Sequence, residues 1–346
     1  MDFGLFYFAN DNCALDTARY DLLLSGARFA DEHDFSAVWT PERHFHPFGG
    51  IYPNPAVTGA AVAAVTERVA IRAGSVVAPL HHPLRIAEEW SVVDNISGGR
   101  AGISLASGWH ATDYVLRPEN YPDRRKLVID YAEQLRGLWR GDSMSAVDGV
   151  GNTSEVRIFP PPVQRELPIW ITSAGGVDTF RAAGRIGAGL LTHLLGQDLD
   201  ELANKIAEYR AAAAEHGSPG HVVLMVHTFL GDDEDQVRET VREPLSNYLR
   251  GSINLLLGSQ LPGAKKIDPA KLRDSEIDFL VSRSFDRYYE DGGLLGTVPK
   301  ALRVVDRARD LGVDELACLI DFGVDPKHVL AGLHHLNELR LLAKKA

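Results

Sequence analysis

Four side chains that can bind ligands, form ion pairs or transfer protons lie within five positions of one another. They are Glu42, Arg43, His44 and His46, and they follow the short apolar run 35–38, which predicts a buried strand. The small-residue run 56–65 behind them predicts a helix. In an α/β protein such a cluster lies at the carboxyl end of a parallel strand, where ligands bind. The alternative is a solvated loop with one ion pair, but similar polar clusters recur at other predicted strand ends.

A second candidate site is the turn from Ile171 to Phe180, where a predicted strand runs into small residues and then into a helix. Small residues let backbone N–H groups approach a phosphate, and the amino terminus of a helix adds a favourable dipole. We therefore predict an anion-binding turn made of Ser173, Ala174, Gly175, Gly176 and Thr179. Arg124 and Arg125, which begin an earlier helix, would supply the counter-charge. The alternative is an ordinary strand-to-helix turn in which Thr or Asp caps the helix.

Several well-known site patterns do not occur in the sequence. It contains no Walker loop, no GxGxxG after a strand and no GxSxG elbow, so a Rossmann site for a nicotinamide dinucleotide is not expected. The 13 histidines show no metal-binding spacing, and adjacent pairs such as His81 and His82 rarely bind one ion together, so we predict no metal. The two cysteines, Cys13 and Cys318, belong to no metal or redox pattern, which favours a reducing compartment.

Eight apolar, β-prone runs alternate with helical patterns along the chain. The predicted strands cover residues 3–8, 35–38, 69–77, 100–106, 168–172, 189–192, 221–229 and 315–321. Near-continuous apolar strands are typical of parallel sheets that are covered on both faces. Eight β/α units favour a closed (β/α)8 TIM barrel with its active site at the carboxyl ends of the strands. We treat residues 1–346 as one domain with two insertions, a surface hairpin at 141–165 and a lid-like segment at 251–296.

The composition of the chain narrows the classes of partner. Of its 346 residues, 45% are hydrophobic and 24% are charged, which is ordinary for a globular protein. The formal net charge of −11 argues against a general nucleic-acid binder and against binding to an anionic membrane surface. Neither a signal peptide nor an apolar run long enough to span a membrane is recognisable, so we expect a cytoplasmic protein.

Five motifs in this order resemble the bacterial luciferase-like flavin monooxygenase superfamily across nearly the whole chain. They are Glu42-Arg43-His44-Phe45 with Asn54-Pro55, the run 76–89, the run 94–100 leading to Ser107-Gly108-Trp109, Arg124 ahead of Leu138-Trp139, and the turn 173–179. Segments 295–297 and 312–323 are similar to the subgroup found in natural-product biosynthesis.

The resemblance implies a monooxygenase that binds reduced FMN, supplied by a separate flavin reductase, and that reacts with O2 through a flavin peroxide shielded from water. It implies a flavin face near Ser75, where relatives often have a non-proline cis peptide, and near Ala106, Ser107 and Gly108. It assigns the phosphate to Arg124 and to the turn with Ser173, Gly175, Gly176 and Thr179. The implied substrate is a biosynthetic intermediate, either free or bound to an acyl or peptidyl carrier protein. Relatives are commonly homodimers or homotetramers.

One departure from the family pattern concerns the catalytic residues. Luciferases carry two adjacent histidines after the glutamate, whereas here the first position is Arg43 and the second is His44. We therefore predict Glu42, Arg43 and His44 as the catalytic group, with His44 transferring protons. Arg43 would act as a fixed cation that holds either the flavin peroxide or an anionic substrate.

Two other functions remain open from the sequence. One is an oxidoreductase of the same barrel that uses the deazaflavin F420 for hydride transfer, and the other is a non-catalytic flavin-binding or assembly partner. The subgroup motifs near the end of the chain argue against the first, and the polar clusters at several strand ends argue against the second. The sequence does not identify the substrate, the oxidised atom, or whether the reaction is hydroxylation, Baeyer–Villiger insertion or N-oxidation.

Overall fold

Eight parallel strands close into a barrel, as the sequence predicts. The computed structural model of the protein describes residues 1–8, 19–252 and 272–345. Around the ring the strands are β1 (Asp2–Phe6), β2 (Ala37–Thr40), β3 (Ala70–Val77), β4 (Ala101–Ala106), β7 (Ile169–Thr172), β8 (Gly189–His193), β9 (Val222–Leu230) and β11 (Glu315–Leu319). The ring closes where β8 pairs with β9 and where β11 pairs with both β9 and β1.

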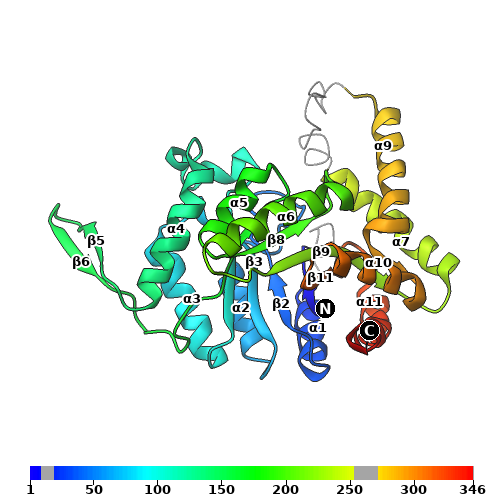
Figure 1. Cartoon of the computed structure of the whole chain (residues 1–346), viewed down its shortest axis with the longest axis horizontal. Coiled ribbons are helices and arrows are strands. Elements are labelled where there is room, and N and C mark those ends of the chain that lie inside the picture. The colour runs from blue at the N-terminus through cyan, green and yellow to red at the C-terminus, as the bar shows by residue number, and fades with distance from the viewer. Residues whose placement is uncertain (9–18, 253–271, 346) are drawn as a thin grey trace.

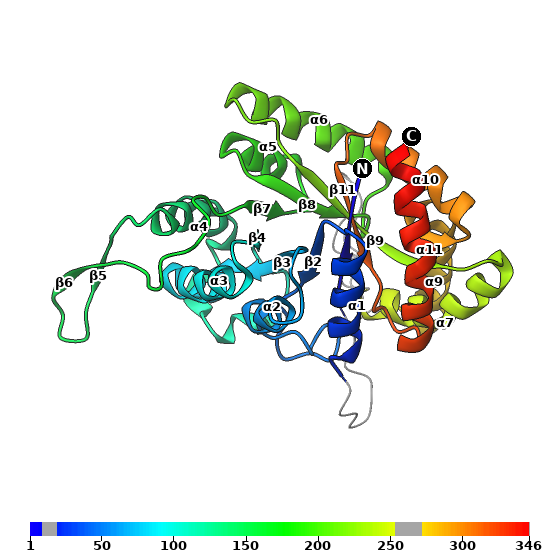
Figure 2. The same ribbon diagram turned by 90° about the horizontal axis from the view of Figure 1, so that it is seen from below.

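Helices follow the strands and surround the barrel (Figures 1 and 2). The α-helices are α1 (Asp21–Glu32), α2 (Pro55–Ala63), α3 (Pro83–Ser97), α4 (Arg124–Trp139), α5 (Val177–Arg185), α6 (Leu199–Glu215), α7 (Glu234–Gly251), α9 (Asp274–Arg287), α10 (Val298–Asp310) and α11 (Pro326–Lys345). Short helical turns are η1 (Ala78–Leu80), η2 (Ala111–Val115), η3 (Pro118–Asn120) and the π-helical turn η5 (Tyr288–Gly292). Side chains cap the starts of α2 and α6. The Asn54 carboxamide oxygen accepts hydrogen bonds from the N–H groups of Ala56 and Val57, and Asp198 forms a capping box with Glu201.

Large side chains fill the barrel near the amino ends of its strands. The Arg72 guanidinium lies against the rings of both Trp39 and Trp170, at 5.0 and 4.6 Å from their centroids, and donates to Glu315 Oε2 at 2.7 Å. Gly189 makes room for this layer, since a Cβ there would lie 2.2 Å from Trp170 Cδ1. With this end filled, a ligand has to enter from the carboxyl end.

The two predicted insertions have different outcomes. Residues 141–165 do form a hairpin, in which β5 (Met144–Val147) pairs antiparallel with β6 (Thr153–Val156) and projects from the body of the protein (Figure 1). In the 251–296 segment, α9 packs on α7, and the short strand β10 (Leu294–Gly296), which the sequence analysis missed, pairs with the end of β9. Residues 253–271, on which the lid interpretation depends, lie outside the described residues.

None of the helices within the described ranges is long and apolar enough to cross a membrane.

Candidate functional site

A cavity of about 610 Å³ opens at the carboxyl ends of the barrel strands. It brings together all but one of the sequence-predicted site residues. Those that line it are Glu42, Arg43, Ser75, Ala106, Ser107, Gly108, Arg124, Ser173, Ala174, Gly175, Gly176 and Thr179. The exception is His44, which is not among the described residues that line the cavity and which instead contacts Glu42. Two clusters that are about 130 positions apart in the sequence therefore belong to one site.

One end of the cavity has the features that an anion site needs. The N-cap residue of α5 is Gly176 and no side chain caps this helix, so the alternative that Thr or Asp caps it is wrong. Gly176 has open space where a Cβ would be, which leaves the backbone accessible. Lys205 Nζ donates to the Ala174 carbonyl at 3.3 Å and braces the turn. Uncapped N–H groups at a helix start, next to the arginines that begin α4, are suited to a phosphate.

Arg124 is held in place at this end of the cavity. Its Nη1 donates to the Tyr121 carbonyl at 2.7 Å, and its guanidinium lies 4.1 Å from the centroid of the Tyr121 ring. Both contacts leave further N–H groups of the guanidinium available for a ligand.

A chain of hydroxyl groups links the floor of the cavity. Ser75 Oγ and Ser104 Oγ lie 2.5 and 2.6 Å from Thr172 Oγ1, so three strands are joined below the ligand space. The Gly74–Ser75 peptide is cis, and the register between β3 and β4 shifts at this point. The adjoining wall is made of the small residues at 106–108, which leave room for a flat ring beside the hydroxyls.

Glu42 is a buried residue of the cavity lining and is held by three donors. Its Oε1 accepts hydrogen bonds from His44 Nε2 at 2.8 Å and from His81 Nε2, while its Oε2 accepts the Val77 N–H at 2.6 Å. Burial alone would raise the pKa of Glu42, but these hydrogen bonds outweigh it and lower the pKa. Burial likewise opposes ionisation of His81, yet the hydrogen bond and charge of Glu42 raise its pKa. The contact between Glu42 and the partly buried His81 therefore favours the charged form of both side chains.

Among the described residues, the group best placed to bind a metal is Glu42, His44 and His81, because their ligand atoms lie within 4.8 Å of one another. In the observed arrangement both imidazoles donate from Nε2 to an ionised carboxylate, which only accepts. Each histidine would have to lose that proton before it could ligate an ion. The geometry is that of a hydrogen-bonded cluster, and we assign no metal to it.

Arg43 points in a different direction from its neighbour His44. The backbone turns sharply at Phe45, whose φ is +53°, and Arg43 is 2% exposed. Arg43 Nη1 donates to both carboxylate oxygens of Asp113, at 2.5 and 2.6 Å. The ring centroid of Trp109 lies 5.0 Å from Arg43 Cζ. The cation is thus fixed by a carboxylate and an indole at the cavity wall.

Three functional candidates were not among the residues predicted as catalytic or cofactor-binding: His81, Asp113 and His193. His193 ends β8 and lines the cavity, and its Nδ1 accepts the Leu195 N–H at 3.1 Å. Burial lowers its pKa to about 4, so the ring is neutral and its remaining proton sits on Nε2. Because His193 directly follows the strand predicted at 189–192, the sequence could have indicated that it lies at the cavity. Asp113 lies in the helical turn η2, four positions after the Ser107-Gly108-Trp109 motif, but neither its residue type nor its spacing from that motif indicated a role.

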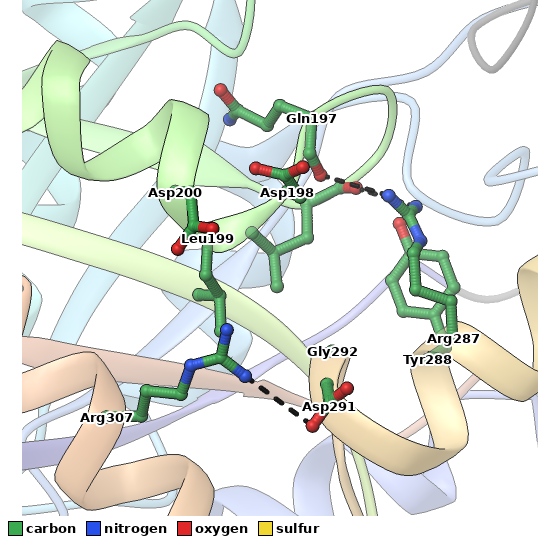
Figure 3. A pocket seen from close by; sticks show the side chains of 10 residues that line it. Gln197, Asp198, Leu199, Asp200, Arg287, Tyr288, Asp291, Gly292 and Arg307 are labelled. Carbon is green, nitrogen blue, oxygen red and sulfur yellow. Dashed lines mark hydrogen bonds and ion pairs between the residues drawn. The ribbon is translucent and has the colours of Figure 1, made fainter.

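A second, smaller cavity of about 160 Å³ lies between the start of α6, the turn η5 and α10 (Figure 3). Both arginines that line it are already engaged: Arg287 Nη1 donates to the Gln197 carbonyl at 3.2 Å, and Arg307 Nη1 lies 3.5 Å from Asp291 Oδ1. This cavity contains none of the residues that the sequence predicts for chemistry.

Comparison with known proteins gives consistent matches. The family model described as luciferase-like monooxygenase matches residues 1–291. The oxygenase component of a flavin-dependent trigonelline monooxygenase from Acinetobacter baylyi is 25% identical over 332 residues, covering 92% of this chain and 88% of that protein. Among solved structures, the monooxygenase RslO1 from Streptomyces bottropensis aligns over 100% of both chains with a TM-score of 0.82 and 23% identity.

Two further solved structures share the fold and differ in cofactor. The oxygenating constituent of 3,6-diketocamphane monooxygenase from Pseudomonas putida, in complex with FMN, has a TM-score of 0.73 and 18% identity, covering 99% of this chain and 97% of that one. An F420-dependent secondary alcohol dehydrogenase, in complex with an F420–acetone adduct, has a TM-score of 0.71 and 18% identity, covering 98% and 97%.

Proposed function

The chain belongs to the luciferase-like monooxygenase family, and from that membership we propose that it is the oxygenase of a two-component system that uses reduced FMN and O2. The predicted class of enzyme, a flavin-dependent monooxygenase, is confirmed at the level of the family. The observation that supports the use of reduced FMN is one cavity that is lined both by the predicted anion-binding turn and by the buried Arg43. We propose a biosynthetic intermediate as the substrate.

The residues around the cavity fit a flavin mononucleotide. Its volume of about 610 Å³ lies within the range of small-molecule sites. The phosphate would bind at the uncapped start of α5, with hydroxyls from Ser173 and Thr179 and charge from Arg124. The flat ring would lie over Ser75 and the small residues 106–108.

When bound, the reduced flavin would supply the electrons that activate O2. The chain itself would position the ring, exclude water and hold charge. Aromatic side chains line the cavity beyond the hydroxyl floor: Phe6, Phe8, Phe48, Trp109 and Tyr248. Such a wall keeps water from the reacting atoms and strengthens electrostatic interactions inside the site. We propose that Glu42 and His44 orient this wall through their hydrogen bond, and that His44 remains the candidate for proton transfer.

The partners are proposals of the same kind. The relative from Acinetobacter baylyi is named as an oxygenase component, which supports a separate flavin reductase for this chain. We also propose that the substrate can be presented on an acyl or peptidyl carrier protein and that the protein assembles as a homodimer or homotetramer. An F420-dependent oxidoreductase is the second candidate, because one protein of similar fold is F420-dependent.

Cofactor titrations test the proposal directly. The protein would be titrated with FMN, riboflavin and F420, following flavin fluorescence, for the wild type and for Arg124→Gln. We expect FMN to bind more tightly than riboflavin, and Arg124→Gln to weaken FMN binding by about tenfold or more while leaving riboflavin unchanged. The matched control is Arg140→Gln at the opposite end of α4, where Arg140 pairs with the exposed Glu166 at 3.4 Å.

Turnover separates the two candidate functions. Oxygen-dependent oxidation of acyl thioesters with reduced FMN and a flavin reductase would support the monooxygenase. Binding of F420 without binding of FMN, or equal affinity for FMN and riboflavin, would contradict the proposed site.

A further inference from the structure

The guanidinium of Arg43 is only partly used by the protein. Nη1 binds both oxygens of Asp113, with side-chain exposures of 2% and 4% for the two residues. The other two nitrogens, Nε and Nη2, are buried and have no hydrogen-bond partner within the described part of the chain. A buried arginine at a ligand cavity thus keeps two unused donors.

Unused buried donors are unfavourable, and native proteins contain few of them. Leaving one buried polar group without a partner costs about 1–3 kcal/mol, and more for a charged group. Such groups therefore call for a specific explanation, and a ligand that supplies the missing acceptors is one. The position of Arg43 among the cavity-lining residues makes a ligand the natural source.

The two free nitrogens define the shape of the missing partner. Nε–H and Nη2–H point from the same edge of the planar guanidinium, and this edge matches two oxygens of one carboxylate. Asp113 occupies the opposite side through Nη1 and fixes the orientation of the plane. The Trp109 ring lies over the guanidinium and restricts its rotation. The arginine is therefore fixed in one orientation, and its free edge is the side at which a ligand would supply the missing acceptors.

The surroundings of Arg43 identify the rest of the ligand. The neighbouring lining residues Phe8, Phe48 and Tyr248 are apolar or aromatic. The Phe8 and Phe48 rings pack at 5.2 Å and the Phe48 and Tyr248 rings at 4.8 Å between centroids, so they form one continuous wall. Two other carboxylates lie nearby and both are engaged: Glu42 by His44, His81 and the Val77 N–H, and Asp321 by the Phe8 N–H and the Tyr52 hydroxyl. An apolar body with one carboxylate is complementary to this end of the cavity.

We propose that Arg43 is a specificity residue, which binds a carboxylate of the substrate through Nε and Nη2 while the apolar body of the substrate lies on the aromatic wall. The proposal builds on the proposed function, because it names the chemical class of substrate for the same cavity. Asp113 is then a positioning residue, since it orients the arginine without contacting the substrate.

Two small probes of the same shape test this assignment. Benzoate and acetophenone differ in having a carboxylate or a methyl ketone on the same ring. Their binding would be measured by calorimetry, first on the protein without flavin and then with saturating FMN, for the wild type, Arg43→Gln and Arg43→Lys. The titration without flavin makes the result independent of whether the FMN proposal holds.

We expect the wild type to bind benzoate at least about tenfold more tightly than acetophenone, as a paired charge-assisted hydrogen bond requires. Arg43→Gln should abolish this preference, and Arg43→Lys should lose most of it, because an ammonium keeps the charge but not the two parallel donors. The control Arg117→Gln removes a cation from the same region, one that pairs with Glu119 at 2.6 Å outside the cavity, and should keep the full preference.

Three results would overturn the assignment. One is a wild type that binds benzoate no better than acetophenone, including the case in which it binds neither. Another is a preference for benzoate that persists in Arg43→Gln. The third is a preference that is lost in Arg125→Gln instead, which would mean that the anion binds at the phosphate end.

Discussion

Removing Asp113 should be among the most destabilising single changes in this protein. The pair that it forms with Arg43 is almost completely buried, with exposures of 2% and 4%, and Nη1 contacts both carboxylate oxygens at 2.5 and 2.6 Å. Asp113→Ala leaves a buried cation with no counter-charge and no hydrogen-bond partner. Breaking such a pair by deleting one partner costs about 3–5 kcal/mol. That is a large share of the 5–15 kcal/mol, roughly, by which domains are stable.

Urea unfolding, followed by both far-UV circular dichroism and tryptophan fluorescence, measures this loss and checks that the two signals report one transition. The double variant Arg43→Met/Asp113→Ala should recover most of the loss, because neither charge then remains buried. The surface pair Lys126–Asp130 is the matched control: its atoms lie 3.0 Å apart but its side chains are 78% and 37% exposed. Asp130→Ala should change the free energy of unfolding by less than about 1 kcal/mol.

The reasoning is refuted if Asp113→Ala destabilises the protein no more than Asp130→Ala does. It is equally refuted if the effects of the two single changes at the buried pair simply add in the double variant, since coupled charges must give a non-additive result.

Two further predictions follow from the packing and the electrostatics. Gly189→Ala should destabilise the protein by about 1–3 kcal/mol in the same urea assay, because its Cβ would lie 2.2 Å from Trp170 Cδ1. The control Gly149→Ala, whose Cβ would meet nothing within 4 Å, should leave the free energy of unfolding nearly unchanged. Equal effects of the two substitutions would contradict the packing argument. Since Glu42 raises the pKa of His81 in the folded state, the stabilisation from this pair is complete below pH 6.5 and is lost as the pH rises through the raised pKa. The urea midpoint of the wild type should therefore fall as the pH rises through that window, and it should fall less in His81→Gln. The same pH dependence in both proteins would disprove the contribution of the Glu42–His81 pair.

The architecture could be predicted because its signals are local. Each barrel strand is a short apolar run between polar loops, and the alternation with helical patterns fixes the parallel arrangement. Parallel strands in a barrel present their carboxyl ends on one side, so the loops after residues 40 and 172 had to meet there. That topological argument, made from sequence, places Glu42, Arg43 and the 173–176 turn at one cavity.

Side-chain directions within those loops could not be predicted. Arg43 and His44 are adjacent, yet Arg43 lines the cavity, whereas His44 is not among the lining residues and contacts Glu42. The difference depends on the local backbone, including the positive φ at Phe45. A positive φ is uncommon for phenylalanine, so the residue type does not predict it. The sequence predicted Arg43 as a site residue, and the structure places it at the cavity, but the sequence did not predict its ion-pair partner Asp113.

The sequence by itself determined the barrel, the family and the end of the barrel at which the predicted site residues gather, because motifs, periodicity and strand count are properties of consecutive residues. Only the tertiary structure decided that Asp113 pairs with Arg43 across 70 positions and that His81 pairs with Glu42 across 39. Both pairs depend on closure of the sheet, which brings loops from different β/α units into contact. The energy of a buried charge depends on its partner and its exposure, and neither exists until the chain has folded.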